Sequence, residues 1–220
     1  MKIIALFDFC DTIVRTQTVG QFCRGYLREQ KRLPKNLILF YKIINKLSYY
    51  CRRKGIWFRL LRGASLNQLN DFSMAFSKKL YENFLIQEIG ERIRWHQQQG
   101  HMIYIVSAGL SFYVSEVARK LGIEHVIATE LEIKDQRLTG RLGEKGMCYG
   151  EKKVDQLMQY LSPAECSAID WESSYAYTDH VSDLPMLNLV GNPFIVIQKN
   201  KKIRFLNSSV YHAIQFFRFE

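Results

Sequence analysis

The sequence predicts an α/β fold: a parallel sheet with helices on both faces, interrupted by a helical insertion after the first strand. Two runs of strand length, residues 3–7 and 101–106, are continuously apolar, which is typical of strands buried on both faces. After residue 100 such runs alternate with helical stretches, and this alternation indicates parallel strands joined by helices. Residues 15–99 show no strand pattern, so we expect the insertion there.

The composition is that of a globular protein with a packed core. The 220 residues are 47% hydrophobic and 13% aromatic. The first apolar run is too short for a signal peptide or a membrane span, and the run at 36–47 is broken by Lys42 and Lys46. The five cysteines form no C-x-x-C pair, which argues against a disulfide framework or a zinc site. We therefore expect a cytoplasmic protein that is not an integral membrane protein.

The first strand is expected at residues 2–7, and it ends abruptly at Asp8 within the stretch FDFCDT. Helices follow in the insertion, with usual boundary residues: Pro34 and Ser65 precede helices, and Gly100 follows one. The expected helical ranges are 16–32, 35–53, 56–62, 66–80 and 82–99.

In the second half, apolar residues in 110–121 recur at helical spacing and Gly122 closes the stretch. Apolar residues alternate on either side of 134–136, which indicates a small β-hairpin near 131–142. The other expected elements are strands at 101–106, 125–129, 174–178 and 193–197, helices at 151–161 and 182–190, and a helical C-terminal tail.

Several chemically active residues fall at the carboxyl ends of these strands or in the loops facing them, where a doubly wound sheet forms its crevice. Carboxylates there can bind Mg²⁺, which prefers oxygen ligands. A serine hydroxyl and a lysine ammonium suit the oxygens of a phosphoryl group, and an aspartate can attack phosphorus. The residues are Asp8, Ser107, Lys153, Asp179 and Asp183.

Four short motifs resemble those of the haloacid dehalogenase superfamily, in the subfamily that includes phosphoserine phosphatase. FDFCDT resembles the Asp-x-Asp-x-Thr motif, and IYIVSAG resembles the second motif, an apolar strand ending in Ser or Thr. GEKKV resembles the lysine motif, and TDHVSD resembles Asp-x-x-x-Asp. Each pattern is weak alone, but all four occur in the family's order on the expected elements.

The resemblance implies a Rossmann-like, three-layer core formed by residues 1–14 and 86–220, and a helical, strongly basic cap formed by residues 15–85. It implies that Asp8 is the nucleophile and that Asp8, the backbone carbonyl of Cys10 and Asp179 bind Mg²⁺. Asp183 would support the metal or Lys153. Ser107 and Lys153 would hold the phosphoryl group, and the same motifs add Thr12, Ala108 and Gly109 to the substrate-binding residues.

The first motif departs from the family pattern at position 10. Relatives that hydrolyse phosphate esters usually carry Asp there, where it protonates the leaving alkoxide and later activates water. The thiol of Cys10 can donate a proton, but it is no equivalent of a carboxylate as a base. Asp11 is the other candidate, and it would need a local bulge to reach the site. The acid–base residue is therefore open between Cys10 and Asp11.

The net charge of +10 is concentrated in residues 24–62, which contain twelve Lys and Arg and one acid, Glu29. Such a segment is often only a solvated face, but it can also meet an anionic substrate or surface. We expect no specific nucleic acid partner. Our hypothesis is that some of these arginines recognise a second anionic group, or an anionic surface that bears the substrate: Arg24, Arg28, Arg52, Arg53 and Arg59.

The sequence therefore predicts a Mg²⁺-dependent phosphomonoesterase that forms an aspartyl phosphate on Asp8. Its substrate would be a small phosphorylated metabolite or an ester with an anionic headgroup. Because of Cys10, the alternatives are a slow or inactive protein on this fold that binds polyanions through the basic cap, or a phosphotransferase.

Overall fold

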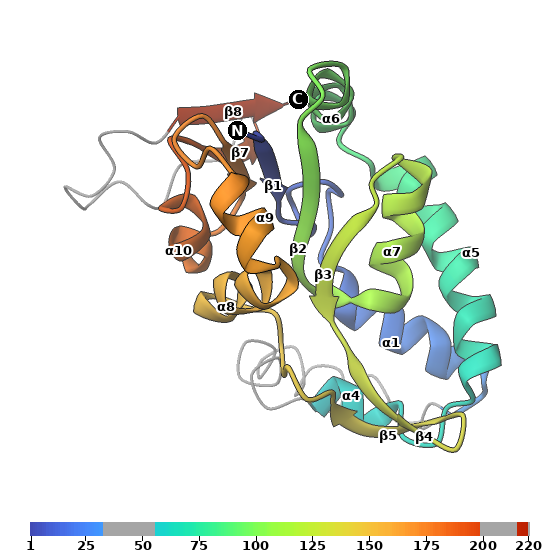
Figure 1. Ribbon diagram of the computed structural model, residues 1–220. Coiled ribbons are helices and arrows are strands. Elements are labelled where there is room, and N and C mark those ends of the chain that lie inside the picture. The colour runs from blue at the N-terminus through green and yellow to red at the C-terminus, as the bar shows by residue number, and fades with distance from the viewer. Residues whose placement is uncertain (33–55, 199–214, 220) are drawn as a thin grey trace.

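The computed structural model describes residues 1–32, 56–198 and 215–219. Its main feature is a parallel sheet of six strands in the order β3-β2-β1-β6-β7-β8 (Figure 1). The strands are β1 (Ile4–Phe7), β2 (Met102–Leu110), β3 (His125–Thr129), β6 (Tyr175–Thr178), β7 (Asn192–Gln198) and β8 (Gln215–Phe219). The predicted α/β class with a parallel sheet is confirmed.

β1 lies between β2 and β6, and all four of its residues are buried. Ile4 and Leu6 face one hydrophobic cluster, while Ala5 and Phe7 face the other. Successive side chains of a strand point to opposite faces, so the continuous apolar run supplies both layers of the core.

Helices cover both faces of the sheet (Figure 1). One face carries α1 (Thr18–Glu29), α5 (Leu66–Phe84), α6 (Gln87–Gln98) and α7 (Ser111–Lys120), whose buried residues belong to the cluster around Phe7. The other carries α8 (Glu151–Tyr160), α9 (Pro163–Ala168) and α10 (Leu184–Leu187). The sheet is therefore the middle of three layers.

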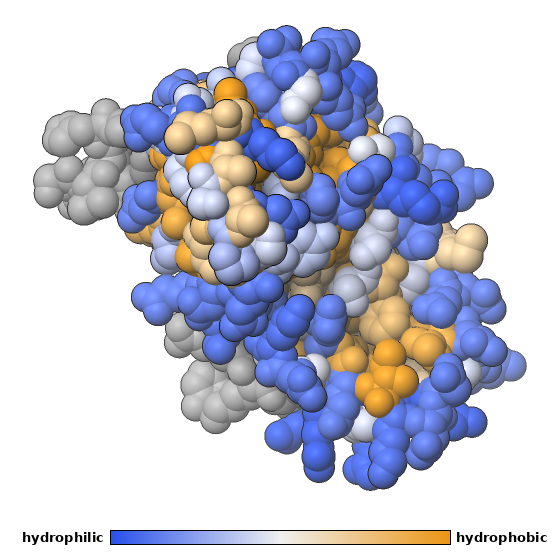
Figure 2. Space-filling view, in the orientation of Figure 1, coloured by the Kyte–Doolittle hydropathy of each residue, from blue (hydrophilic) through white to orange (hydrophobic). Residues whose placement is uncertain are grey.

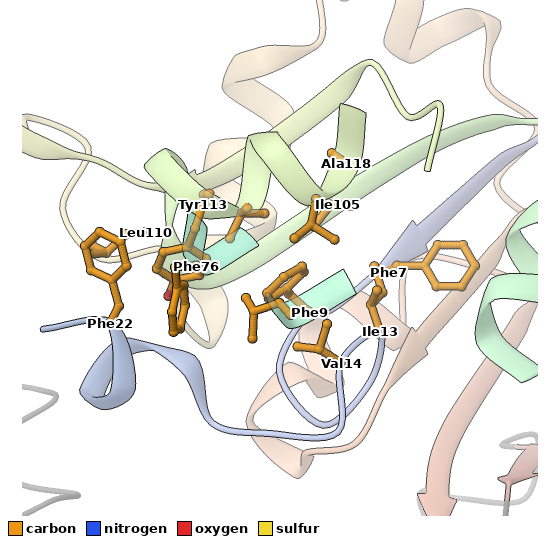
Figure 3. Close-up of a cluster of buried hydrophobic side chains, with 14 of the residues drawn as sticks. Phe7, Phe9, Ile13, Val14, Phe22, Phe76, Ile105, Leu110, Tyr113 and Ala118 are labelled. Atoms are coloured by element: carbon orange, nitrogen blue, oxygen red, sulfur yellow. The ribbon is translucent and has the colours of Figure 1, made fainter. Parts of the chain in front are cut away.

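The insertion packs directly on the core. Phe22 of α1 and Phe76 of α5 lie around Tyr113 of α7, with ring centroids 5.0 and 5.3 Å from the tyrosine ring (Figure 3). Phe9 is part of the same cluster, 6.2 Å from Tyr113. One hydrophobic cluster thus crosses the predicted boundary between core and cap, and the division at residues 14 and 86 stays a prediction.

A short helix, α4 (Ile56–Leu60), lies next to the antiparallel hairpin of β4 (Leu131–Lys134) and β5 (Arg137–Leu142) (Figure 1). Gly140 makes this contact possible: it has φ +82°, and a Cβ there would lie 3.2 Å from the Cα of Arg59. The predicted hairpin is confirmed, and it holds α4 near the carboxyl edge of the sheet.

The structure corrects the prediction of a helical tail, because residues 215–219 form β8, an edge strand paired with β7. The aromatic run around Phe216 and Phe217 favours a strand, and Phe219 is buried. Residues 199–214, where the tail was expected to be helical, lie outside the described residues. So does the helix expected at 35–53.

Other helix boundaries also differ from the prediction. The helix expected at 82–99 begins only at Gln87, because Leu85 forms a bridge with Val14. The one expected at 182–190 is a 3₁₀ turn (Val181–Asp183) followed by α10. Helix α9 was not predicted, although Ser162 and Glu165 form a capping box at its start.

The face seen in Figure 2 is mostly hydrophilic, and the apolar colour is confined to smaller areas. Large exposed apolar side chains are few among the described residues and scattered: Met74, Ile133, Tyr160 and Phe216, besides Met1. Within the described part of the chain, every helix is too short or too polar to cross a lipid bilayer.

Candidate active site

A cavity opens at the carboxyl ends of β1, β2 and β6. Its volume is about 140 Å³, room for several waters or a phosphoryl group, since one water needs roughly 10–15 Å³. We call the part lined by polar residues at the strand ends the polar end, and the part lined by residues of α1, α4 and the loop before α8 the apolar end. The lining residues are Asp8, Cys10, Gln17, Val19, Trp57, Phe58, Ser107, Ala108, Gly109, Met147, Tyr149, Lys153, Asp179, His180, Ser182 and Asp183.

A buried lysine between two aspartates forms the centre of the polar end. Asp8 follows β1, and its backbone N–H donates to the carbonyl of Tyr177 on β6 at 2.9 Å. The Nζ of Lys153, in the first turn of α8, lies 2.6 Å from Oδ1 of Asp8 and 2.5 Å from Oδ2 of Asp183. Lys153 is only 2% exposed. The structure thus places Lys153 in the cavity, while Lys152 is exposed.

Asp183 is fixed by further hydrogen bonds. The hydroxyl of Thr178 donates to its Oδ2 at 2.8 Å, and the hydroxyl of Ser182 donates to its Oδ1 at 3.2 Å. Asp183 stands at the N-cap position of α10, but its side chain caps no backbone N–H there. Its carboxylate therefore positions Lys153.

Burial and like charges dominate the electrostatics of this end. Burial raises the pKa of Asp8, although the charge of Lys153 opposes this. Burial raises the pKa of Asp179 to about 8, helped by the charges of Asp8, Asp11 and Asp183. Burial alone would lower the pKa of Lys153, but Asp8 and Asp183 more than offset this and raise it, so the lysine is a permanent cation. One cation thus faces an excess of carboxylates.

That excess of negative charge fits a divalent cation. In the described part of the chain, no three acidic, histidine or cysteine side chains converge to form a complete side-chain metal site. Mg²⁺ needs less, because it keeps several waters and takes one or two carboxylates. Asp8 and Asp179 both line the cavity and could supply them, with the backbone carbonyl of Cys10 beside Asp8.

The segment Ser107–Gly109 also lines the cavity, at a register irregularity of β2. The backbone N–H of Gly109 donates to Oγ of Ser107 at 2.9 Å. A Cβ on Gly109 would lie 2.9 Å from Val114 and 3.2 Å from Oγ of Ser107, so only glycine fits there. Ser107 is not the N-cap of α7, a position that Leu110 occupies.

The structure separates the two candidates for the acid–base role. Cys10 lines the cavity, and its Sγ lies 3.0 Å from the hydroxyl of Thr18, which lies 2.8 Å from the hydroxyl of Tyr113. Burial, with the charge of Asp8, raises the pKa of the thiol to about 12, so it stays protonated. Asp11 has φ +55° in a tight turn and does not line the cavity; its carboxylate accepts a 2.6 Å hydrogen bond from Gln17.

The remaining predicted binding residues lie at different depths. Thr12 is buried, and its hydroxyl donates to Oδ2 of Asp8 at 3.4 Å, a long hydrogen bond. Arg24 does not line the cavity; its guanidinium lies 5.8 Å from the ring centre of Trp57. Arg52 lies outside the described residues.

The apolar end of the cavity was missed from the sequence. Trp57 and Phe58 lie in a segment whose main signal is its positive charge, and Met147 and Tyr149 lie in a loop without periodicity. Thr18 and Thr178 were missed as well, although a hydroxyl at the end of the strand YAYT is a recognisable signal.

The family model for haloacid dehalogenase-like hydrolases matches residues 5–188, and the chain belongs to this family. The resemblance stated from the motifs is thereby confirmed.

Two relatives show how the similarity is distributed. A probable phosphatase of Mycobacterium tuberculosis is 36% identical over 109 residues, which is 50% of this chain but only 36% of that protein's length. The phosphoserine phosphatase of Methanocaldococcus jannaschii is 25% identical over 194 residues, covering 86% of this chain and 83% of that protein.

Solved structures agree with the fold. A Bordetella pertussis Tohama I protein of unknown function superposes with a TM-score of 0.77 at 25% identity, over 89% of this chain and 91% of its own. A phosphoserine phosphatase in its apo form superposes with a TM-score of 0.64 at 21% identity, over 89% and 86% of the two chains.

Proposed function

We propose that the protein hydrolyses phosphomonoesters through an aspartyl phosphate on Asp8. The observation that carries this is the arrangement at the end of β1: Asp8 lines a cavity and is held 2.6 Å from a buried lysine that Asp183 fixes from its other side. A carboxylate held at a strand tip beside a permanent cation suits attack on an anionic phosphoryl group.

The reaction has two displacements at phosphorus. A carboxylate oxygen of Asp8 forms a bond to phosphorus while the bond to the ester oxygen breaks, and the leaving alkoxide takes up a proton. Water then attacks the same phosphorus, loses a proton, and releases phosphate and the free carboxylate. Lys153 offsets the negative charge of the phosphoryl oxygens throughout, and the hydroxyl of Ser107 donates to one of them.

Mg²⁺ fits the acidic end of the cavity, where Asp8, the backbone carbonyl of Cys10 and Asp179 would hold it. When bound, it supplies positive charge that neutralises the phosphoryl oxygens.

The site lacks a carboxylic acid at position 10 to transfer protons to the leaving group and from water. Cys10 stands where a carboxylic acid would serve, and its raised pKa leaves the thiol able to donate a hydrogen bond but not to act as a base near neutral pH. We expect slow turnover of alkyl phosphates, whose leaving groups need a proton, and faster turnover of aryl phosphates. The same observation supports the alternative of a weakly active binding protein.

The substrate class is a small phosphate ester. Relatives named as phosphoserine phosphatase and histidinol-phosphatase support this proposal. The proposal also includes a cytoplasmic location. It further includes contact between the basic segment at residues 24–62 and an anionic surface.

The test is phosphate release from an aryl phosphate by wild type and by Asp8→Asn, with Asp71→Asn as control. Asp71 is an exposed acid on α5, away from the cavity. We expect Asp8→Asn to lose at least about 10³-fold in kcat, as for removal of a nucleophile, and Asp71→Asn to match wild type. Chelation of divalent cations should abolish activity and Mg²⁺ should restore it. Equal rates for Asp8→Asn and wild type would refute the proposal.

A further inference from the structure

The cavity that holds Asp8 has a second, apolar end. Of the described residues lining it, charged side chains occur only near the strand tips, at Asp8, Lys153, Asp179 and Asp183. Beyond them the lining is apolar or uncharged. The residues that α1, α4 and the segments before α1 and α8 contribute to this lining are Gln17, Val19, Trp57, Phe58, Met147 and Tyr149.

Two of the aromatic residues of this end, Trp57 and Phe58, are packed between neighbouring elements. Trp57 is 6% exposed and Phe58 is 2% exposed, although both line the cavity. On one side, α1 approaches Trp57 closely at Gly20, where a Cβ would lie 3.6 Å from the indole ring. The guanidinium of Arg24 lies over the same ring at 5.8 Å.

The hairpin fixes α4 from its other side. Gly140 of β5 brings the hairpin backbone against Arg59, one residue after Phe58. Because α1 and the hairpin both contact α4, Trp57 and Phe58 are in place before any ligand binds. We call these two side chains the aromatic wall. Side chains that are already ordered lose little conformational entropy when a ligand binds.

The described residues that line this end carry no charge that could pair with a charged leaving group. Lys153 is already paired with two carboxylates, and His180 shares a 2.9 Å hydrogen bond with Ser182. A leaving group such as serine carries both a carboxylate and an ammonium, and burying charges without partners is costly. An apolar group instead gains roughly 25 cal/mol for each Å² that it removes from water.

We infer that the preferred substrate is a phosphomonoester of an uncharged apolar alcohol, whose hydrocarbon or aromatic body packs against Trp57, Phe58 and Met147. This inference rests on the proposed phosphatase function for its reaction, and it adds the class of the alcohol. The phosphoryl group lies at Asp8 and Lys153, and the alcohol occupies the apolar end of the same cavity.

The experiment compares kcat/KM for benzyl phosphate, phosphoserine and acetyl phosphate, all with Mg²⁺. Benzyl and seryl phosphates are both primary alkyl esters, so they differ mainly in the body of the leaving group, and acetyl phosphate is too small to fill the apolar end. We expect benzyl phosphate to be preferred over phosphoserine by at least about tenfold, or ~1.4 kcal/mol.

Variants test whether the aromatic wall causes the preference for benzyl phosphate over phosphoserine. Trp57→Ala should lower kcat/KM for benzyl phosphate by about tenfold, mainly through KM, and should lower it for acetyl phosphate by a much smaller factor. Met147→Lys, in a loop that contributes no helix or strand, should shift the preference toward phosphoserine. Trp171→Ala is the matched control, because it removes an indole that packs in the other hydrophobic cluster, away from the cavity.

Binding is measured in parallel, by calorimetric titration of Asp8→Asn with benzylphosphonate, with and without Trp57→Ala. If no ester is hydrolysed but benzylphosphonate binding depends on Trp57, the reaction is refuted and the apolar subsite stands. If acetyl phosphate is hydrolysed in a manner that needs Asp8, but phosphoserine equals or exceeds benzyl phosphate, the subsite inference is overturned and the phosphatase proposal stands. Benzylphosphonate binding that ignores Trp57 would also overturn the subsite.

Discussion

The two ends of the cavity are built by different means. The polar end is defined by short hydrogen bonds between buried charges, with Lys153 within 2.6 Å of two carboxylates. The apolar end is defined by close packing, with Trp57 and Phe58 confined between α1 and the hairpin. Hydrogen bonds fix the direction of a few atoms, and packing fixes a volume. We therefore expect changes at the first end to alter the reaction, and changes at the second to alter the choice of substrate.

The largest expected effect comes from Lys153→Met. The change leaves Asp8 and Asp183 buried without their shared cation, which should cost about 3–5 kcal/mol of stability. It also removes the charge that faces the phosphoryl group, worth about 10²–10³-fold in kcat. Urea unfolding and phosphate release measure the two effects, and Lys152→Met, at an exposed position, is the control. Similar losses in both variants would mean that the polar end is not organised around Lys153.

The next effect comes from Cys10→Asp, which supplies the missing carboxylic acid without touching the aromatic wall. General acid–base catalysis contributes about 10²–10⁴-fold, so kcat on benzyl phosphate should rise by at least tenfold. Aryl phosphates, whose leaving groups need little protonation, should gain much less. Cys10→Asn is the control, since it has the size of Asp but cannot transfer the proton. A gain of equal size on both ester classes would contradict this role for position 10.

Gly140→Ala should act only through the apolar end. The new Cβ would meet the backbone of Arg59 at 3.2 Å and push α4 from its place, at a cost of about 1–3 kcal/mol. The KM for benzyl phosphate should rise, while kcat/KM for acetyl phosphate should stay near the wild-type value. Gly100→Ala is the matched control: Gly100 has a similar φ of +72°, but a Cβ there has nothing within 4 Å. If both variants behaved alike, backbone strain and not the displacement of α4 would be the cause.

The last effect concerns stability alone, at a buried histidine of α6. His96 shares hydrogen bonds with His101 (2.8 Å) and Tyr177 (3.0 Å), and burial, with the charges of His101 and Arg92, lowers its pKa to about 3. A lowered pKa in the folded state gives stability that is present above the unfolded pKa near 6.5 and is lost as the pH falls toward 3. The loss is at most about 1.4 kcal/mol per pH unit.

Urea unfolding between pH 7 and pH 4 tests this contribution. The raised pKa values of Asp8 and Asp179 act in the opposite sense, since those acids favour the folded state as they take up protons. His96→Gln should therefore make the protein relatively more stable at low pH. If the stability of His96→Gln varied with pH as the stability of wild type does, the contribution of His96 would be refuted. The polar end would then be the main source of the pH dependence.

The same contrast explains what could be predicted from the sequence. The polar end was predictable because Asp8, Ser107, Lys153 and Asp179 follow or face buried strands, and the topology of a parallel sheet brings such positions together. The apolar end was not, because Trp57 and Phe58 occupy a five-residue helix whose position depends on contacts with β5, far away in the chain. The glycine at position 140 is compatible with that contact, but a glycine alone does not predict it.

Local signals also failed where tertiary pairing decides the structure. The tail around Phe216 was expected to be helical, but its backbone pairs with β7 and forms the sheet edge. The position of Asp11 was open because one turn controls it: with φ +55°, its side chain points to Gln17 and not into the cavity. A tight turn of this kind depends on a single dihedral angle, which side-chain patterns do not report.

The central place of β1 bears on how the protein reaches its native state. Ile4 pairs with Met102 and Ala5 with Tyr175, so the strand that carries the nucleophile precedes both of its partners in the chain by long stretches. Contacts of such high sequence separation form slowly, because the chain loses loop-closure entropy before the strands pair and gain stabilising contacts. Asp8 therefore gains its surroundings only when most of the sheet has assembled, and a partly folded chain holds a fully apolar strand with no neighbour on either side.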